Sequence, residues 1–261
     1  MIIIKSDDEI VLMREAGGIA NTVLREVAAF VEPGKTTLDL DHFAGERIEH
    51  YGGKSAFLGY RGYPCQICIS VNEEVVHGIA NERRLLFGDI VSLDVGVRYG
   101  GFVGDNAVTV AVGGCGVEDQ SLLDVTERSL MEGINKATEG NRVSDISRAI
   151  QKVIEDSEMS VVKEFVGHGV GRSVHEEPQI PNFYSGGKSP KLKAGMTLAI
   201  EPMVNLGTPQ VEVLSDRWTV VTRDGLRSAH FEHTVLVTEG EPEILTCPEN
   251  MPSTLKARLS S

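Results

Sequence analysis

Two aspartates in one glycine-rich segment could hold a metal ion. Residues 94–105 read DVGVRYGGFVGD, which predicts a β-hairpin that turns near Tyr99 and Gly100. With that turn, Asp94 and Asp105 would be cross-strand partners on one face of the hairpin. Two such charges repel each other unless a cation or a shared proton lies between them. Taken alone, the pair could also be two solvated acids on an exposed face.

A second glycine-rich segment carries two histidines. His168 and His175 are seven positions apart in the run GHGVGRSVH. Glycines at alternate positions disfavour a helix and favour an extended or looped backbone, which other groups can approach closely. One histidine is commonly a partly buried polar residue, but two in such a segment favour a functional site.

Two glutamates stand beside apolar runs that are typical of strands. Glu201 ends one such run and is followed by Pro202, which would stop the strand. Glu232 leads into the second run, residues 234–238. An acid in such apolar surroundings needs a partner. That partner is either an arginine or lysine side chain or a metal ion.

Together these segments offer four carboxylates and one imidazole. The candidate ligands are Asp94, Asp105, His168, Glu201 and Glu232. Mostly hard oxygen ligands of this kind suit two divalent first-row ions that share bridging carboxylates. Two ions about 3.5 to 4 Å apart can hold a hydroxide and polarise a carbonyl, so the set predicts a hydrolase. The sequence contains no H-E-x-x-H, G-x-x-x-x-G-K or G-x-S-x-G motif to compete with this interpretation.

The elements that would position these residues occur in a repeated order. Ser6 to Glu9 has the form of a capping box, and helical periodicity follows it as far as Pro33. The predicted elements are helices over about 7–32 and 37–51, strands over about 66–71, 89–97 and 102–112, helices over about 119–137 and 144–156, and further strands from about 161.

Matching positions about 106 residues apart indicate an internal duplication. In each half a glycine is followed six residues later by a carboxylate, Asp94 in the first half and Glu201 in the second. Chance could supply several of the other matches, because they are few and involve common residues. No linker rich in proline, serine or charge separates the halves. We therefore expect one domain, residues 1–261, with half-repeats over about 1–115 and 116–250.

Composition restricts the class of protein. The 261 residues carry a formal net charge of −13, which argues against a nucleic-acid-binding surface rich in Lys and Arg. No apolar run approaches the roughly 18 residues that span a bilayer, and the N-terminal apolar run is too short for a signal peptide. Four cysteines are too few for a disulfide scaffold. We expect a cytoplasmic protein that binds neither nucleic acid nor membrane.

Eight ordered segments resemble those of the type I methionine aminopeptidases over nearly the whole chain. They are IIIKSDDEIVLMREAG, VEPGKTTLDLD, GYPCQICISVNEEVVHGI, GDIVSLDV, GFVGDNA, GHGVGRSVHEEP, AIEPMV and FEHTVLVT. The resemblance implies the pita-bread fold. This is an α/β fold in which two lobes related by a pseudo-twofold axis surround a central sheet rich in antiparallel pairs.

The resemblance also places the family's metal ligands on the five residues named above. Asp105 and Glu232 would bridge two divalent ions. Asp94 would bind one ion bidentately, and His168 and Glu201 would complete the coordination of the other. The ions would be Co, Mn, Fe, Zn or Ni, among which these ligands do not choose.

The reaction implied by the resemblance is removal of the N-terminal methionine from nascent proteins whose second residue is small and uncharged. Glu201 would act as general base towards a water that bridges the metals. His175 would stabilise the oxyanion, and His77 would hydrogen-bond the substrate amide. The pocket for the methionine side chain would be walled by Tyr60, Tyr63, Cys68 and Trp218, with Val174 and Met203 nearby. A ribosome contact and a monomeric state are further implications.

Three residues depart from the family's usual pattern. Val174 stands where an aromatic residue is frequent, Gly96 where threonine is frequent, and His230 where glutamine is frequent. These departures bear on pocket shape and metal preference. Cys65 and Cys68 form a C-x-x-C pair, but no second pair accompanies them, so we reject a zinc ribbon.

Other branches of the same fold agree less well with the sequence. Only 31 residues separate Glu201 from Glu232, too few for the helical insertion of the type II enzymes. The chain starts at the catalytic domain, which favours a bacterial-like or organellar source. Arg172, without an added N-terminal domain, argues against the prolidase and aminopeptidase P branches. An X-Pro exopeptidase and a non-catalytic pita-bread binding protein stay open as alternatives.

Overall fold

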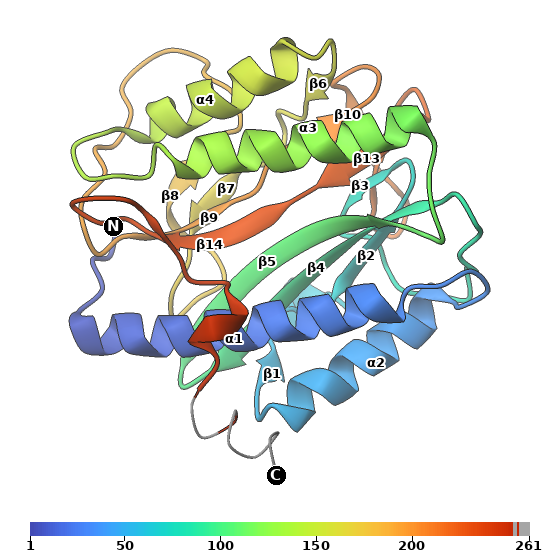
Figure 1. The fold of residues 1–261 in the computed structure, drawn as a ribbon, viewed down its shortest axis with the longest axis horizontal. Coiled ribbons are helices and arrows are strands. Elements are labelled where there is room, and N and C mark those ends of the chain that lie inside the picture. The colour runs from blue at the N-terminus through green and yellow to red at the C-terminus, as the bar shows by residue number, and fades with distance from the viewer. Residues whose placement is uncertain (253–254, 256–261) are drawn as a thin grey trace.

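Four long helices form a layer over the main sheet. In the computed structural model, which describes residues 1–252 and 255, they are α1 (Asp7–Phe30), α2 (Thr37–His50), α3 (Val117–Ile134) and α4 (Val143–Glu155). Figure 1 shows α1 and α2 along one half of the sheet and α3 and α4 along the other. α1 packs against the strands of the first half, and α3 packs against α4 and the strands of the second half.

The first helix begins at the capping box that the sequence predicts. The hydroxyl of Ser6 accepts a hydrogen bond from the Glu9 N–H, and the Glu9 carboxylate accepts one from the Ser6 N–H. α1 ends at Phe30, before Pro33, as expected. Both ends of the helix are therefore determined by local sequence.

The main sheet has nine strands, and its strand pairs are antiparallel. Its order is β1-β4-β5-β14-β9-β7-β8, with β2 also paired to β4 and β15 to β14. The strands are β1 (Lys54–Ser55), β2 (Cys68–Val71), β4 (Ile90–Tyr99), β5 (Phe102–Ala111), β7 (Gly167–Gly169), β8 (Glu176–Ile180), β9 (Thr197–Ile200), β14 (Glu232–Leu236) and β15 (Glu243–Ile244). The β5–β14 pair joins the two halves of the chain.

Two small sheets and two short 3-10 helices are the remaining named elements of the described residues. One sheet has the order β13-β10-β6 and the other β11-β12-β3. Their bounds are β3 (Glu74–Val76), β6 (Ser160–Val161), β10 (Met203–Asn205), β11 (Val211–Val213), β12 (Val220–Thr222) and β13 (Ser228–His230), and the 3-10 helices are η1 (Tyr60–Gly62) and η2 (Pro248–Asn250).

The β4–β5 hairpin turns one residue later than predicted. Tyr99 pairs with Phe102, so the turn residues are Gly100 and Gly101, with φ of 57° and 86°. A two-residue hairpin loop needs positive φ at these positions, and glycine adopts it without the steric cost that Tyr99 would have.

This turn changes the pairing of the two aspartates. Asp94 is opposite Ala107, and Asp105 is opposite Gly96. The predicted direct pairing of Asp94 with Asp105 was therefore wrong. The strands are displaced by two residues relative to the prediction, and because the side-chain period of a strand is two, both carboxylates still share one face.

Glycines let α1 lie directly on the sheet. A Cβ atom at Gly104 would lie 2.6 Å from the backbone of Ala16, and one at Gly17 would lie 2.5 Å from the carbonyl oxygen of Leu245. Neighbouring residues in a strand point to opposite faces, so Asp105 points away from α1. The carboxylates therefore occupy the face of the sheet that α1 leaves uncovered.

Each predicted half-repeat contributes two helices and strands of the main sheet. Residues 1–115 supply α1, α2, β4 and β5, and residues 116–250 supply α3, α4, β9 and β14. One cluster of buried apolar side chains comes mostly from the first half and another mostly from the second. The single domain and the internal duplication stay predictions, which this arrangement supports.

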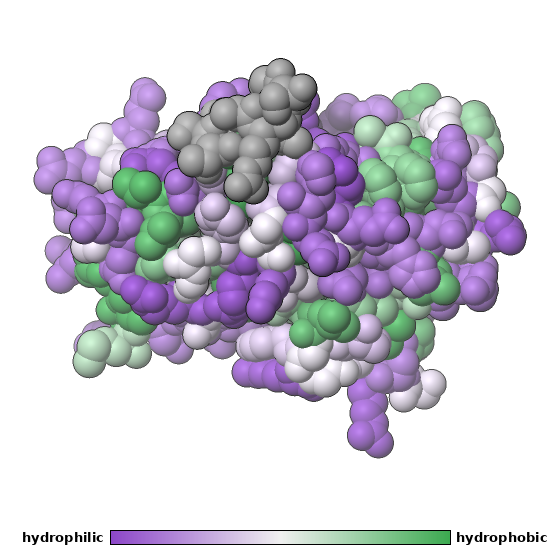
Figure 2. Space-filling model, turned by 90° about the horizontal axis from the view of Figure 1, so that it is seen from below, coloured by the Kyte–Doolittle hydropathy of each residue, from purple (hydrophilic) through white to green (hydrophobic). Residues whose placement is uncertain are grey.

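Apolar side chains gather in the interior. Met13, Ile69 and Leu93 are among the largest that are fully buried. Figure 2 shows a face on which hydrophilic residues predominate and hydrophobic ones form scattered groups. Within residues 1–252 and 255, no helix combines the length and the apolar character needed to cross a bilayer.

Candidate active site

A cavity of about 180 Å³ lies on the face of the sheet that carries the carboxylates. Its lining residues are Phe57, Tyr60, Arg61, Tyr63, Cys68, His77, Asp94, Asp105, His168, Val174, His175, Glu201, Trp218 and Glu232. All five predicted metal ligands and all but one of the predicted substrate contacts are in this set. Met203 lies outside it, in a separate buried cluster with Val75, Val162 and Val220.

Phe57 and Arg61 also line the cavity, and sequence reasoning missed both. The only signal available was their position next to Tyr60 and Tyr63. Neither residue type has a spacing that marks a site, because the wall forms only when this segment folds back over β2 and β4. Their contribution becomes visible in the packed structure.

Three ligand atoms converge from three strands. Asp105 on β5, His168 on β7 and Glu232 on β14 each supply one atom, and these atoms lie within 4.8 Å of one another. All three residues are buried. The antiparallel order of the main sheet brings them together from distant parts of the chain.

Three buried carboxylate oxygens have no hydrogen-bond donor among the described residues 1–252 and 255. They are Oδ1 of Asp94, Oδ1 of Asp105 and Oε1 of Glu232. An ionised carboxylate taken out of water is strongly destabilised unless another group compensates its charge. A bound cation supplies that compensation, so these atoms fit a metal site.

His168 presents a lone pair to Glu201. Its Nδ1 lies 2.9 Å from the carbonyl oxygen of Gly169. A carbonyl can only accept, so Nδ1 carries the proton and Nε2 does not. Nε2 lies 3.3 Å from Oε1 of Glu201. This is the tautomer of a histidine that ligates a metal through Nε2 and is held by a hydrogen bond from its other nitrogen.

The burial of these groups shifts their pKa values away from the charged forms. Desolvation raises the pKa of Asp105 to about 7. The pKa of Asp94 is raised by burial and then by the charge of Asp105. The pKa values of Glu201 and Glu232 are also raised, first by burial and then by the neighbouring carboxylates. Desolvation lowers the pKa of His168 to about 3. A divalent cation would let these carboxylates stay ionised together.

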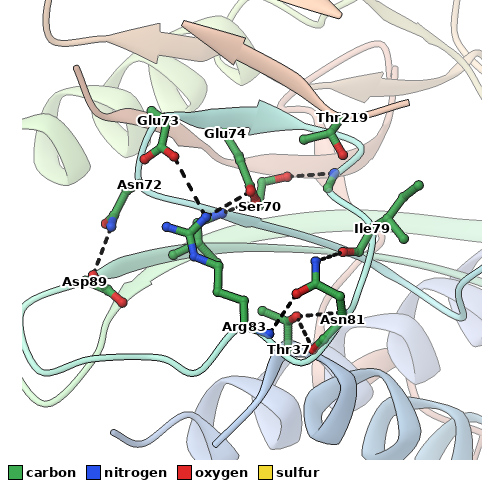
Figure 3. A network of polar contacts seen from close by, with 12 residues as sticks. Thr37, Ser70, Asn72, Glu73, Glu74, Ile79, Asn81, Arg83, Asp89 and Thr219 are labelled. Carbon is green, nitrogen blue, oxygen red and sulfur yellow. Dashed lines mark hydrogen bonds and ion pairs between the residues drawn. The ribbon is translucent and has the colours of Figure 1, made fainter. Parts of the chain in front are cut away.

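A polar network fixes the segment that carries His77 (Figure 3). The N–H of Gly78 donates to Oγ of Ser70 at 3.1 Å, and Arg83 forms an ion pair with Glu74 at 2.9 Å. His77 itself has φ of 59°, a left-handed conformation that is uncommon outside glycine. The flanking contacts hold it there, with its ring in the cavity wall.

His175 is held by a tyrosine and lies against His168. Its Nδ1 is 2.8 Å from the hydroxyl of Tyr60, and its ring centroid is 4.3 Å from that of His168. Burial and then the charge of Arg61 lower the pKa of His175. When the Tyr60 hydroxyl donates to Nδ1, the neutral ring keeps its proton on Nε2 and has a donor available.

The remaining wall of the cavity is apolar. The Tyr63 ring packs edge-on against Trp218 at 5.1 Å between centroids, and the Tyr63 hydroxyl donates to the Gly78 carbonyl oxygen at 2.7 Å. Cys68 is paired with Asp94 across β2 and β4. Cys65 and Cys68 are both buried free thiols. A side chain in the cavity would therefore meet aromatic rings and sulfur next to the carboxylates.

This fold and this donor set are those of a metal-dependent hydrolase. The model of metallopeptidase family M24 matches residues 11–239. The chain is 49% identical to methionine aminopeptidase 1 of Bacillus subtilis over 246 residues, with 94% of this chain and 99% of that protein covered. It is 50% identical to a methionine aminopeptidase of Clostridium perfringens, with the same coverage. The chain belongs to metallopeptidase family M24 and, within it, to the methionine aminopeptidases.

Solved structures agree with this assignment. The methionine aminopeptidase of Thermotoga maritima superposes with a TM-score of 0.92 at 47% identity, with 95% of this chain and 100% of that chain covered. The prolidase of Pyrococcus furiosus has a TM-score of 0.77 at 22% identity, with 94% and 65% covered, and shares the fold alone. The predicted pita-bread fold and the predicted enzyme class are confirmed.

Proposed function

We propose that this enzyme removes the N-terminal methionine from peptides and nascent proteins whose second residue is small and uncharged, with two divalent ions bound per chain. The observation that carries the proposal is a single cavity with a polar side and an apolar side. Buried carboxylates and His168 form one side, and Tyr63, Cys68 and Trp218 form the other. Such a cavity can hold the unbranched apolar side chain of a substrate residue while the carbonyl group of that residue faces the carboxylates.

The residues that would hold the ions are Asp94, Asp105, His168, Glu201 and Glu232. Support comes from the unpartnered carboxylate oxygens and from the lone pair that His168 presents. Co, Mn, Fe, Zn and Ni all suit this set. When bound, the ions would polarise the scissile carbonyl and lower the pKa of the attacking water.

Three side chains would carry the proton transfers and the hydrogen bonds to substrate. The carboxylate of Glu201 accepts the proton of the attacking water as general base. His175, with its proton on Nε2 and its Nδ1 bonded to Tyr60, donates to the oxyanion that forms at the carbonyl. His77 hydrogen-bonds the amide of the scissile bond.

The same proposal includes the wider setting of the enzyme. Action on chains that emerge from the ribosome, a cytoplasmic location and a monomeric state rest on the resemblance of the sequence. None of these depends on the geometry of the cavity.

The test is release of the free N-terminal amino acid by chelator-treated protein. Met-Ala-Ser, Met-Leu-Ser and Ala-Pro are each supplied with and without added Mn or Co. We expect metal-dependent release from Met-Ala-Ser, little from Met-Leu-Ser, and no cleavage of Ala-Pro. Cleavage of Ala-Pro in place of Met-Ala-Ser would overturn the proposal in favour of an X-Pro exopeptidase. Metal binding without any cleavage would favour a binding role.

A further inference from the structure

His230 is a second histidine at the carboxylate of Glu201. Its Nε2 lies 3.7 Å from Oε2 of Glu201, whereas Nε2 of His168 lies 3.3 Å from Oε1. The two imidazoles therefore approach different oxygens of one carboxylate. His230 is 2% exposed.

The Nε2 atom of His230 is unpartnered. It has no hydrogen bond within the described part of the chain, residues 1–252 and 255. A buried polar atom without a partner is destabilising, so each such atom in a native structure needs an explanation. Here the nearest charged group is the Glu201 carboxylate, which itself needs compensation in its ionised form.

The backbone of His230 is anchored to β5 by one side chain. The His230 N–H donates to Oγ1 of Thr109, and the Thr109 hydroxyl donates to the His230 carbonyl oxygen, each at 2.9 Å. The Ser92 hydroxyl, 2.8 Å from Thr109 Oγ1, can donate to the same oxygen. His230 also pairs with Met203 across β13 and β10. This anchoring fixes the side from which the imidazole approaches Glu201.

The carboxylate of Glu201 has few other nitrogen neighbours. Asn182 donates to the Glu201 carbonyl oxygen at 3.0 Å, so this contact holds the backbone and not the carboxylate. Within residues 1–252 and 255, the lysine, arginine and histidine nitrogens within 4.0 Å of this carboxylate belong to His168 and His230. Since His168 presents a lone pair, His230 is the one that can supply a proton donor.

We propose that His230 is a positioning residue whose Nε2–H donates a hydrogen bond to Oε2 of Glu201 and leaves Oε1 to bind a metal ion together with His168. The inference rests on the proposed function only for the role of Glu201 as a metal ligand. Closing the observed distance to about 3 Å makes a normal hydrogen bond. Outer hydrogen-bond partners of metal ligands contribute about 10- to 100-fold to metal affinity.

The test is metal affinity in two variants of His230. His230→Gln keeps an N–H donor at a similar reach, and His230→Met fills a similar volume without a donor. Titration calorimetry of the metal-free proteins with Co²⁺ should give a dissociation constant about 10- to 100-fold higher for H230M. H230Q should stay within about threefold of the unaltered protein, and the visible spectrum of bound Co²⁺ should change in H230M but not in H230Q.

His233 supplies a matched control. It stands next to Glu232 on β14, so its side chain points to the opposite face of the sheet, where Nδ1 lies 2.8 Å from Oγ1 of Thr246. His233→Met removes a half-buried histidine without touching Glu201, and we expect Co²⁺ affinity within about threefold of the unaltered protein. Circular dichroism of each metal-free variant checks that it is folded. If H230M does not fold, His230→Leu takes its place.

Two results would overturn the inference. The first is an H230M protein, or its leucine substitute, that binds Co²⁺ as tightly as the unaltered chain. The second is an H230Q protein that loses as much affinity as H230M, which would make the ring nitrogen itself a ligand. Because no peptide is present in these titrations, a failure of the proposed peptide specificity leaves their outcome unaffected.

Discussion

Gly96 on β4 lies directly against the ring of Phe57, in the wall of the active-site cavity. A Cβ atom at Gly96 would be 2.5 Å from Cε1 and 2.7 Å from Cζ of that ring. The aromatic side chain therefore fills the space that a side chain at position 96 would take. Phe57 is buried and lines the cavity, so the space left at Gly96 allows the ring to form part of the cavity wall.

The first prediction concerns this pair. Gly96→Ala should push the Phe57 ring into the cavity and lower kcat/KM for Met-Ala-Ser about tenfold, because the displaced ring takes space from the substrate and a loss of about 1.4 kcal/mol in transition-state binding is tenfold. Adding Phe57→Ala to the same protein should recover most of the loss, because the clash disappears. Kinetics of the two single variants and the double variant measure the coupling. Additive effects would show that the two residues act independently.

The second prediction concerns Glu201, the proposed general base. Glu201→Gln keeps the size of the side chain and removes its ability to accept a proton, so kcat for Met-Ala-Ser should fall about 10²- to 10⁴-fold. Glu212→Gln on β11, where the side chain is exposed, is the matched control and should leave kcat unchanged. An E201Q protein with near-normal kcat in the presence of Mn would remove Glu201 from the proposed role.

The candidate ligands could be proposed from the sequence because each is recognised from its immediate neighbours in the chain. An acid such as Glu201 or Glu232 next to an apolar run is conspicuous whatever the fold, and it needs a partner wherever it is buried. The register of Asp94 against Asp105 could not be predicted, because it depends on which two residues make the turn. The actual turn lies one residue after the predicted one, which shifts the strand pairing by two residues. Side chains alternate between the two faces of a strand, so a shift by an even number keeps both aspartates on one face.

The pocket wall was harder to predict because it arises from packing between segments. Phe57 reaches the cavity only because Gly96 leaves room for it. Met203, which by resemblance was expected near the pocket, joins a different apolar cluster. Phe57 and Met203 are both apolar residues of the kind found in any protein core. Their type and spacing therefore do not show which of them lines the cavity.

The third prediction concerns the close approach of α1 to the sheet. Gly104→Ala should destabilise the protein by about 1–3 kcal/mol, because the new Cβ would meet the α1 backbone at Ala16 and Gly17 at 2.6 Å. Gly240→Ala is the matched control, since a Cβ there meets nothing within 4 Å, and it should stay within about 0.5 kcal/mol. Urea unfolding measures both. Equal midpoints for the two variants would contradict the packing argument.

The fourth prediction concerns the pH dependence of stability at Asp41. This α2 residue accepts hydrogen bonds from the N–H groups of Gln66 at 2.8 Å and Ile67 at 3.1 Å. Burial nevertheless raises the pKa of Asp41. An acid whose pKa is higher in the folded state favours folding while protonated, and this contribution is lost as the pH rises through the folded-state pKa.

Asp41→Asn keeps an acceptor and never ionises. The free energy of unfolding of D41N relative to the unaltered protein should therefore increase between about pH 4, the value for an unfolded aspartate, and pH 7. Urea titrations of both metal-free proteins at the two pH values measure the difference, and the other carboxylates are common to both. A difference that is constant or decreases would show that the two backbone hydrogen bonds outweigh desolvation.

The last prediction concerns removal of the metal. Four carboxylates line one cavity, and Oδ1 of Asp94, Oδ1 of Asp105 and Oε1 of Glu232 have no hydrogen-bond donor among the described residues. A divalent cation bound there should therefore stabilise the fold. At a free Mn concentration about 100 times its dissociation constant the gain is about 2.7 kcal/mol. For a chain of this size that raises Tm by about 5–10 °C above the chelator-treated protein. Asp94→Asn should reduce the rise, whereas Asp124→Asn, exposed on α3, should not. Identical Tm values with and without Mn would mean that the carboxylates do not bind it.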